Sequence, residues 1–192
     1  ALRRAGAVVH NGALVDVVRP YRQLRAVNVE GTRRLLHAAL EAGCPFHYVS
    51  TLSVFPKPGG DADAVAREQA PPEVPRGLTS GYAQTKWVAE GLVRAAHRAG
   101  LPSVIHRATA IMGHSTTGQT NREKDVVHRL LEACVTLGLA PHVDTTFNMV
   151  PVDHCAAAIA ELVEAGAAPE HPLHLASPEN PAFDLLWEWM TE

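Results

Sequence analysis

The sequence predicts an open α/β fold built on a parallel sheet. Short apolar runs at 7–10, 46–50 and 103–107 alternate with longer segments of helical spacing at 21–42 and 80–99. Strands that alternate with helices form parallel sheets joined by right-handed crossovers, because a tight turn cannot connect parallel neighbours. We therefore expect an open, doubly wound parallel sheet.

Turn and capping residues set the limits of these first elements. The strand at 7–10 ends at Asn11-Gly12, and Gly43 closes the helix at 21–42 in the way a C-terminal cap does. Thr79 or Ser80 caps the next helix, which Gly100 ends.

The same signals continue to the end of the chain. We expect a helix at 123–137 stopped by Gly138, a strand at 145–150, a helix at 152–166 with Asp153 in its first turn, a strand at 173–176 and a helix at 183–190. The segments 51–79 and 108–122 read as loops after strand ends. Open α/β sheets bind ligands at those carboxyl ends.

Composition excludes several function classes. A chain of 192 residues with 46% hydrophobic and 19% charged residues is of ordinary globular type and suits one domain. The net charge of −3 comes without a basic stripe, so we expect no nucleic-acid partner. No apolar run approaches the roughly 18 residues of a membrane helix, so no membrane partner is expected.

Cysteine and histidine usage argues against metal and disulfide frameworks. The three cysteines are widely spaced and form no CxxC pair, which favours the reducing cytoplasm. The eleven histidines are scattered, and the closest pair, His171 and His174, has no third ligand nearby. We expect no metal site.

The motif with the clearest chemistry is Tyr82-Ala83-Gln84-Thr85-Lys86. A spacing of four places Tyr82 and Lys86 on one helix face, where an ammonium lowers the pKa of a nearby phenol. The phenol then serves as a proton donor to a developing alkoxide. The alternative interpretation is a surface pair without a role.

Two strand ends supply further candidates. Val49-Ser50-Thr51 ends the strand before the Tyr82 helix, and the Thr51 hydroxyl is placed to bond a substrate carbonyl or merely to cap the strand. The small residues of Asn11-Gly12-Ala13 either admit a ligand to the backbone or form an ordinary turn.

These residues, in this order, resemble the extended short-chain dehydrogenase/reductase (SDR) enzymes. More narrowly, the chain resembles the thioester reductase domains of nonribosomal peptide and polyketide synthetases and of carboxylic acid reductases. The similarity is carried by HNGALVDVVRPYRQLRAVNVEGT (10–32), YVSTLSV (48–54), GYAQTKWVAE (81–90) and GHSTTGQTN (113–121).

The resemblance implies reductive release. An acyl or peptidyl thioester on the phosphopantetheine arm of a carrier protein accepts hydride from NADPH. The thiohemiacetal then collapses to an aldehyde, which some members reduce further to an alcohol.

The resemblance also implies the site residues. Tyr82 would donate the proton, Lys86 would hold the nicotinamide ribose and lower the pKa of Tyr82, and Thr51 would polarise the carbonyl. Asn28 would complete a proton relay through water. The remaining positions fall into two groups: Asn11, Gly12, Ala13, Ala108, Thr109 and Ile111 toward the cofactor, and Ser53, His114, Ser115, Thr117 and Asn121 toward the pantetheine or acyl chain.

The chain departs from the family pattern in two places. No Gly-rich pyrophosphate turn precedes the strand at 7–10, so we expect the N-terminal nucleotide-binding βαβ units of the extended SDR fold to be lacking. On this interpretation residues 1–140 are the second half of the Rossmann-like core and 141–192 begin the substrate-binding portion. The second departure is Arg107-Ala108-Thr109, where the family usually has Arg-Pro-Gly.

Two other hypotheses remain open from sequence. One is an extended SDR that acts on a nucleotide sugar, an acyl-CoA or a small carbonyl compound. The other is a truncated SDR-like module without catalysis. The presence of Thr51, Tyr82 and Lys86 together argues against it.

Overall fold

The computed structural model describes residues 2–55, 66–69, 77–121, 126–139, 141–142 and 145–191. The chain divides into two compact units. The first comprises residues 1–109 and 158–175, and the second comprises 110–157 and 176–192. The chain therefore passes from one unit to the other near residues 109, 157 and 175.

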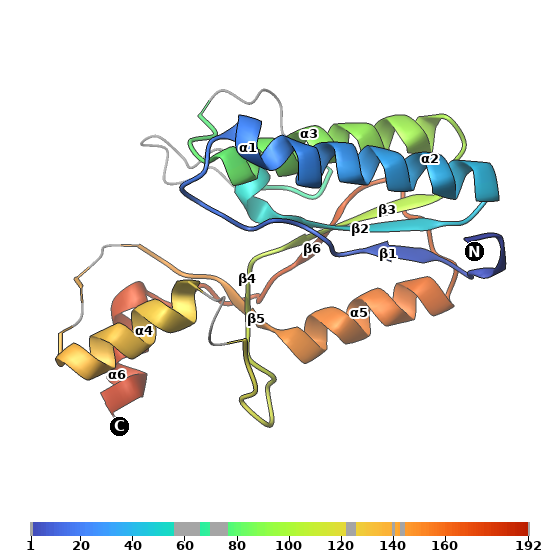
Figure 1. Ribbon diagram of the computed structural model, residues 1–192. Helices are drawn as coiled ribbons and strands as arrows, with labels where there is room; N and C mark the ends of the chain where they lie inside the picture. The colour runs from blue at the N-terminus through green and yellow to red at the C-terminus, as the bar shows by residue number, and fades with distance from the viewer. Residues whose placement is uncertain are drawn as a thin grey trace. The chain divides into compact units, whose positions relative to one another are not determined.

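The first unit is built on a four-stranded parallel sheet in the order β1-β2-β3-β6 (Figure 1). Its strands are β1 (Val8–His10), β2 (Phe46–Thr51), β3 (Ser103–Ala108) and β6 (Leu173–Leu175). Almost every residue of β2 and β3 is buried, as expected of central strands covered on both faces. The predicted parallel α/β architecture is confirmed.

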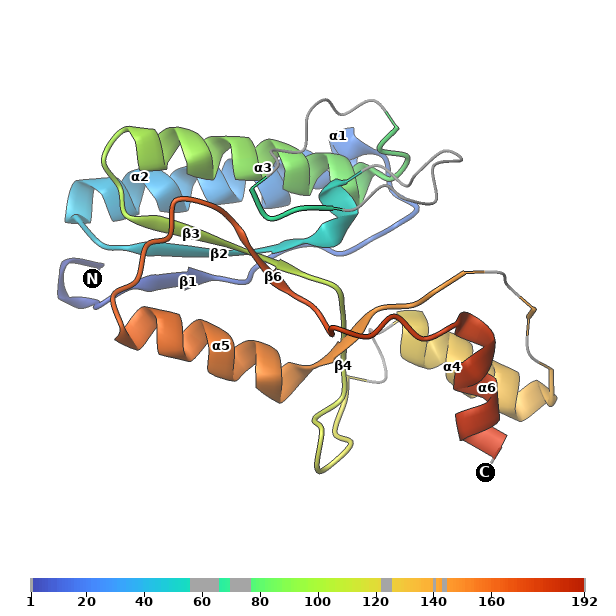
Figure 2. The same ribbon diagram turned by 180° about the vertical axis from the view of Figure 1, so that it is seen from behind.

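Helices cover the two faces of this sheet. Both α2 (Thr32–Ala42) and α3 (Gly81–Arg98) lie on one face, and the part of α5 (Val152–Glu164) that belongs to the first unit lies on the other (Figures 1 and 2). The core between α2, α3 and the sheet is apolar. It contains Leu36, Ala39, Phe46, Tyr48, Ala89, Val93, Leu101 and Ile105.

The helix expected over 21–42 is interrupted. It begins as α1 (Tyr21–Arg25), widens to a π-helix over Ala26–Gly31 and continues as α2. Isolated π turns are found at functional sites, and this one contains Asn28. As predicted, Gly43 ends α2 with a left-handed φ of 63°.

The cap of α3 is also as predicted. The Ser80 hydroxyl accepts a hydrogen bond from the backbone N–H of Ala83 at 3.1 Å. Beyond the last turn, Gly100 takes a φ of 97°. These local signals fix the start of the helix that carries Tyr82 and Lys86.

The second unit holds β4 (Ala110–Met112), β5 (Met149–Pro151), α4 (Val126–Leu137) and α6 (Phe183–Thr191). The prediction of an unbroken polar loop over 108–122 is wrong, because 110–112 pair in parallel with 149–151. The rings of Phe147 and Trp187 meet that of Phe183 edge to face.

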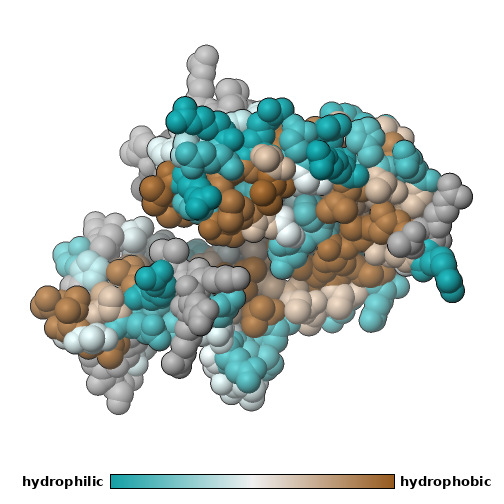
Figure 3. All heavy atoms as spheres, in the orientation of Figure 1, coloured by the Kyte–Doolittle hydropathy of each residue, from teal (hydrophilic) through white to brown (hydrophobic). Residues whose placement is uncertain are grey.

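Hydrophobic surface gathers over β1, which forms one edge of the described sheet (Figure 3). Val9 of this strand is 48% exposed. Within the described residues, no helix has both the length and the apolar character to cross a membrane.

A stacked histidine pair is buried in the sheet. The Nδ1 of His47 on β2 lies 3.1 Å from the Nε2 of His106 on β3, and the rings are nearly parallel. Burial, with His47 close by, lowers the pKa of His106 to about 4, and burial also lowers the pKa of His47. Both imidazoles are therefore neutral at pH 7.

This pair makes the fold sensitive to acid. A folded-state pKa below the unfolded value means that the unfolded chain binds the proton first, so stability is complete above about pH 6.5 and falls toward pH 4. We expect protonation of His106 alone to lower the free energy of unfolding by about 2 kcal/mol between pH 7 and pH 5.

Urea unfolding of wild type and His106→Gln at the two pH values measures this effect. The variant should lose about 2 kcal/mol less than wild type, whereas the exposed His37→Gln should behave as wild type does. An equal loss in wild type and His106→Gln would contradict the assignment.

Candidate active site

One face of α3 carries a row of functional side chains. Tyr82, Lys86 and Glu90 follow one another at intervals of four, so they point the same way from the helix. Lys86 and Glu90 are buried, and Tyr82 is partly exposed. The row lies against the carboxyl half of β2.

Lys86 is anchored directly to that strand. Its Nζ donates a hydrogen bond to the carbonyl oxygen of Val49 at 2.6 Å and lies 4.0 Å from the centre of the Tyr48 ring. Burial lowers the pKa of Lys86 to about 8, and the negative charge of Glu90 acts in the opposite direction. The ammonium is thus held at a site where its charge depends on its neighbours.

The phenol of Tyr82 differs from the expectation. Lys86 was predicted to lower its pKa, but burial raises the pKa of Tyr82 to about 12. The physical reason is that the Lys86 ammonium is engaged by Val49 and Tyr48, while the phenol is desolvated. At neutral pH Tyr82 is therefore a protonated phenol, the form that a proton donor requires.

Thr51 lies at the end of β2 and caps the short 3-10 helix Leu52–Val54. Its Oγ1 accepts from the backbone N–H of Ser53 at 3.1 Å and donates to the Ser53 hydroxyl at 3.2 Å. The Thr51 hydroxyl therefore caps this short helix, and it is partly exposed at the carboxyl end of β2.

Asn28 is wholly committed to protein contacts. Its Oδ1 accepts from the N–H of Leu14 at 2.7 Å, and its Nδ2 donates to the Leu14 carbonyl and to the Thr85 hydroxyl, both at 3.0 Å. Thr85 in turn donates to the carbonyl of Tyr82. Asn28 therefore fixes the segment after β1 to the first turn of α3, and its part in a proton relay remains a prediction.

The turn after β1 borders the same edge. Asn11 and Gly12 are exposed, and Ala13 is partly buried. Sequence reasoning missed His10, just before this turn, whose Nε2 lies 2.9 Å from the Thr32 hydroxyl. Because Thr32 gives its own hydrogen to the carbonyl of Asn28, the hydrogen-bond network assigns the donated proton to Nε2 of His10.

The end of β3 is held by its two neighbours. Ala108 is buried and pairs with Thr51 of β2. Thr109 donates its N–H to the carbonyl of Leu175 at 3.1 Å, which ties it to β6. In this unit the structure therefore gathers Thr51, Ala108 and Thr109 at adjacent strand ends.

The other predicted residues belong to the second unit. Ile111 lies on β4, and His114, Ser115 and Thr117 lie in the tight loop that follows, where Gly118 takes a φ of 66°. Asn121 is exposed beyond it. These residues belong to the second unit, whereas the row on α3 belongs to the first.

A carboxylate holds that loop by hydrogen bonds. Asp153, in the first turn of α5, accepts from the N–H of Ser115 at 2.8 Å and from its hydroxyl at 2.7 Å. These bonds lower the pKa of Asp153 to about 2, so the anchor is charged at neutral pH. The carboxylate therefore ties the loop at Ser115 to the first turn of α5. The described residues contain no group of three or more metal-ligating side chains.

Gly81 is a second residue that sequence reasoning missed. A Cβ at this position would overlap the backbone of Arg19, Pro20 and Tyr21 and lie 2.6 Å from the carbonyl carbon of Pro20. Only glycine allows the segment before α1 to pass so close to the start of α3. Gly81 directly precedes Tyr82 in the first turn of α3. The close approach therefore fixes the position of the backbone that carries the Tyr82 phenol.

Comparison with known proteins agrees with this geometry. The model of an NAD-binding family described as male sterility protein matches residues 2–159. The chain is 44% identical over 160 residues to an isonitrile lipopeptide synthase of Streptomyces coeruleorubidus, covering 83% of this chain and 11% of that protein. It is 37% identical over 180 residues to a linear gramicidin synthase of Brevibacillus parabrevis, covering 93% of this chain and 4% of that protein.

A solved structure extends the comparison to three dimensions. The terminal R domain from the myxalamid PKS-NRPS biosynthetic pathway superposes with a TM-score of 0.89 at 44% identity. The match covers 96% of this chain and 47% of that domain, so the chain spans about half the length of the R domain it resembles.

Fold and comparison together define the class: a Rossmann-like α/β protein of the extended SDR type. Within that class, the chain belongs to the NAD-binding family described as male sterility protein.

The role of Gly81 is open to a matched test, because α3 holds a second glycine. We expect Gly81→Ala to destabilise the fold by about 1–3 kcal/mol or more, since the added methyl overlaps three backbone atoms of the segment 19–21. Gly91→Ala meets no atom within 4 Å and should stabilise the helix by about 1 kcal/mol.

Thermal unfolding of the two variants measures the difference. The melting temperature should fall for Gly81→Ala and rise by a few degrees for Gly91→Ala. Similar melting temperatures in both would show that the approach of Pro20 to α3 is not a constraint on the fold.

Proposed function

We propose that this chain forms the catalytic part of an NADPH-dependent reductase that releases a carrier-bound acyl or peptidyl thioester as an aldehyde. The observation that carries the proposal is the placement of Thr51, Tyr82 and Lys86 along α3 and the adjoining end of β2. The similarity to synthetases and to a terminal R domain supports the substrate class.

The donor groups fit a nicotinamide nucleotide. The Lys86 ammonium suits the hydroxyl oxygens of a ribose, and the turn Asn11–Ala13, exposed at Asn11 and Gly12, offers a site where a ligand can approach the backbone closely. Ala108 and Thr109 flank the same edge. When bound, NADPH would supply the hydride.

The protein's part in the reaction is proton transfer and orientation. As hydride reaches the thioester carbon, negative charge grows on the carbonyl oxygen, and Tyr82 donates its phenolic proton to that oxygen. The Thr51 hydroxyl would orient the carbonyl by a hydrogen bond that strengthens as the charge develops. The C–S bond of the resulting thiohemiacetal then breaks, which yields the aldehyde and the free thiol of the pantetheine arm.

We further propose that the partner is a phosphopantetheinylated carrier protein. On this proposal the loop of His114, Ser115 and Thr117, pinned by Asp153, and the exposed Asn121 and Ser53 would meet the pantetheine or acyl chain. Three cysteines that are buried and free suit a reducing compartment, which for such an enzyme is the cytoplasm.

The test is Tyr82→Phe in the full-length protein, supplied with NADPH and an acyl thioester on a carrier protein. Removal of the phenolic hydroxyl deletes the proton donor and should lower the rate of aldehyde formation by about 10²-fold or more. The trapped product, measured by mass spectrometry, also reports whether reduction stops at the aldehyde or continues to the alcohol.

Tyr21→Phe provides the control, because Tyr21 lies on α1 outside the row of α3. It should retain wild-type turnover. If Tyr82→Phe forms aldehyde at the wild-type rate, Tyr82 is not the proton donor. If the enzyme reduces the acyl group as a CoA ester but not as a carrier-protein thioester, the carrier protein is not its partner.

A further inference from the structure

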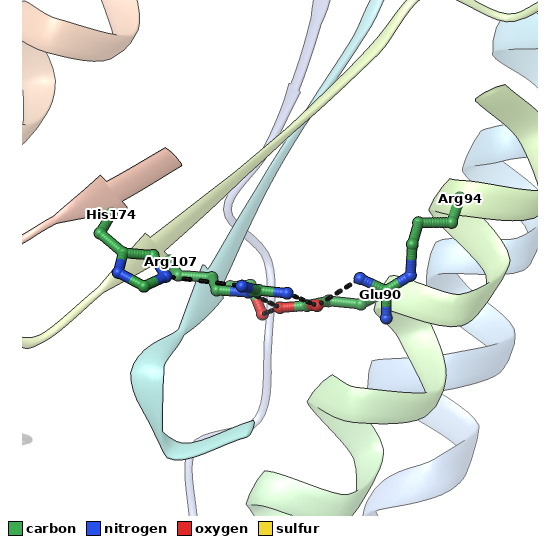
Figure 4. A network of polar contacts seen from close by, with 5 residues as sticks. Glu90, Arg94, Arg107 and His174 are labelled. Carbon is green, nitrogen blue, oxygen red and sulfur yellow. Dashed lines mark hydrogen bonds and ion pairs between the residues drawn. The ribbon is translucent and has the colours of Figure 1, made fainter. Parts of the chain in front are cut away.

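The row on α3 continues beyond Lys86 to a buried carboxylate whose environment is unusual. Glu90 is 0% exposed, and both of its oxygens are fully used (Figure 4). Oε1 accepts from the Ser50 hydroxyl at 2.7 Å and from Nε of Arg107 at 3.1 Å. Oε2 accepts from Arg107 Nη2 and from Arg94 Nη1, both at 3.0 Å.

Arg107 is as deeply buried as its partner. The guanidinium forms a two-pronged pair with Glu90 and lies 4.8 Å from the centre of the Phe55 ring. Its third nitrogen, Nη1, lies 3.4 Å from Nε2 of His174 on β6. One carboxylate therefore connects α3 to β2 and β3, and through Arg107 to β6 and the segment that follows Thr51.

The strand residues that Glu90 holds are the ones just before the candidate site. Ser50 and Arg107 are paired in the sheet register, and so are the next residues, Thr51 and Ala108. A shift of the Glu90 carboxylate would consequently be transmitted to both strand ends.

The charge of Glu90 bears on Lys86 as well. Among the described residues, Glu90 is the only buried acidic side chain, and it lies one helical turn after the buried Lys86. The other titratable groups that face Lys86 are His10 on β1, Tyr48 on β2 and Tyr82 on α3.

None of these three offers a negative charge at neutral pH. Burial raises the pKa values of Tyr48 and Tyr82, and it lowers the pKa of His10. Glu90 is thus the one charged neighbour in this set that favours the ammonium form of Lys86 against desolvation, in addition to the Val49 carbonyl and the Tyr48 ring that contact Nζ.

We propose that Glu90, held by Arg107 and Ser50, is a positioning residue that keeps Lys86 in its ammonium form and keeps the ends of β2 and β3 in register. The effect of Glu90 on turnover rests on the proposed function. Its effect on the protonation of Lys86 is a property of the protein without cofactor or substrate. A purely structural ion pair would stabilise the fold without governing the protonation of Lys86.

The protonation of Lys86 can be read directly. The chain has three lysines, Lys57, Lys86 and Lys124, so lysine labelled with ¹³C at Cε gives three NMR signals, and Lys86→Arg assigns one of them. In the wild type, the Lys86 signal should titrate near pH 8, because that is where burial places its pKa. In Glu90→Gln, which keeps the shape and removes the charge, the midpoint should fall by about one pH unit, a tenfold change in the protonation constant.

Two further variants make the result decisive. Glu161→Gln removes an exposed carboxylate from α5 and should leave the midpoint unchanged. Glu90→Gln with Arg107→Gln avoids leaving the Arg107 charge buried and unpaired, and it is the variant to read if Glu90→Gln alone does not fold. Its midpoint should also fall, because Glu90 is the charged neighbour that raises the pKa of Lys86, but by less than in Glu90→Gln, because the Arg107 cation is removed as well.

A Lys86 midpoint in either folded variant that matches the wild type would overturn the proposal. The measurement needs neither NADPH nor thioester. A confirmed shift in a protein that fails to make aldehyde would therefore count against the proposed function alone. In an active enzyme, the limb of the pH–rate profile that reports Lys86 should move by the same interval in Glu90→Gln.

Discussion

The structure of the first unit depends on how α3 is attached to the sheet through buried polar side chains. Lys86 bonds the Val49 carbonyl, and Glu90 bonds Ser50 and Arg107. Apolar contacts alone would allow the helix to slide, since dispersion and burial have little directionality. Hydrogen bonds with charged partners in a dry interior fix one register, because a misplaced charge there has no water to solvate it.

That attachment explains why the site lies at the carboxyl edge of the sheet. The first turn of α3 approaches Pro20 through Gly81, and Asn28 joins the same turn to the segment after β1. The strand ends at Thr51 and Ala108 are paired with each other. A partly exposed, protonated phenol at Tyr82 is left at the rim, where a carbonyl substrate would meet it.

Much of this could be predicted from local chemistry. The caps at Ser80 and Gly43 and the parallel sheet follow from signals within a few residues of one another. The π-helix around Asn28 could not be predicted, since apolar spacing there suits an unbroken α-helix. Pairing of β4 with β5, and of Glu90 with Arg107, joins residues distant in sequence, so neither has a local signature. The raised pKa of Tyr82 depends on its burial, which a spacing of four residues to Lys86 does not reveal.

On the proposed function, the row on α3 forms one wall of a nicotinamide site. A fluorescence titration of NADPH into the full-length protein and its Lys86→Ala variant tests it most directly, with Arg98→Ala at the far end of the helix as the control. Loss of the ammonium should weaken binding by about tenfold, corresponding to roughly 1.4 kcal/mol, and Arg98→Ala should bind as the wild type does. Equal affinity of Lys86→Ala and wild type would place the cofactor elsewhere and exclude the row on α3 from its binding.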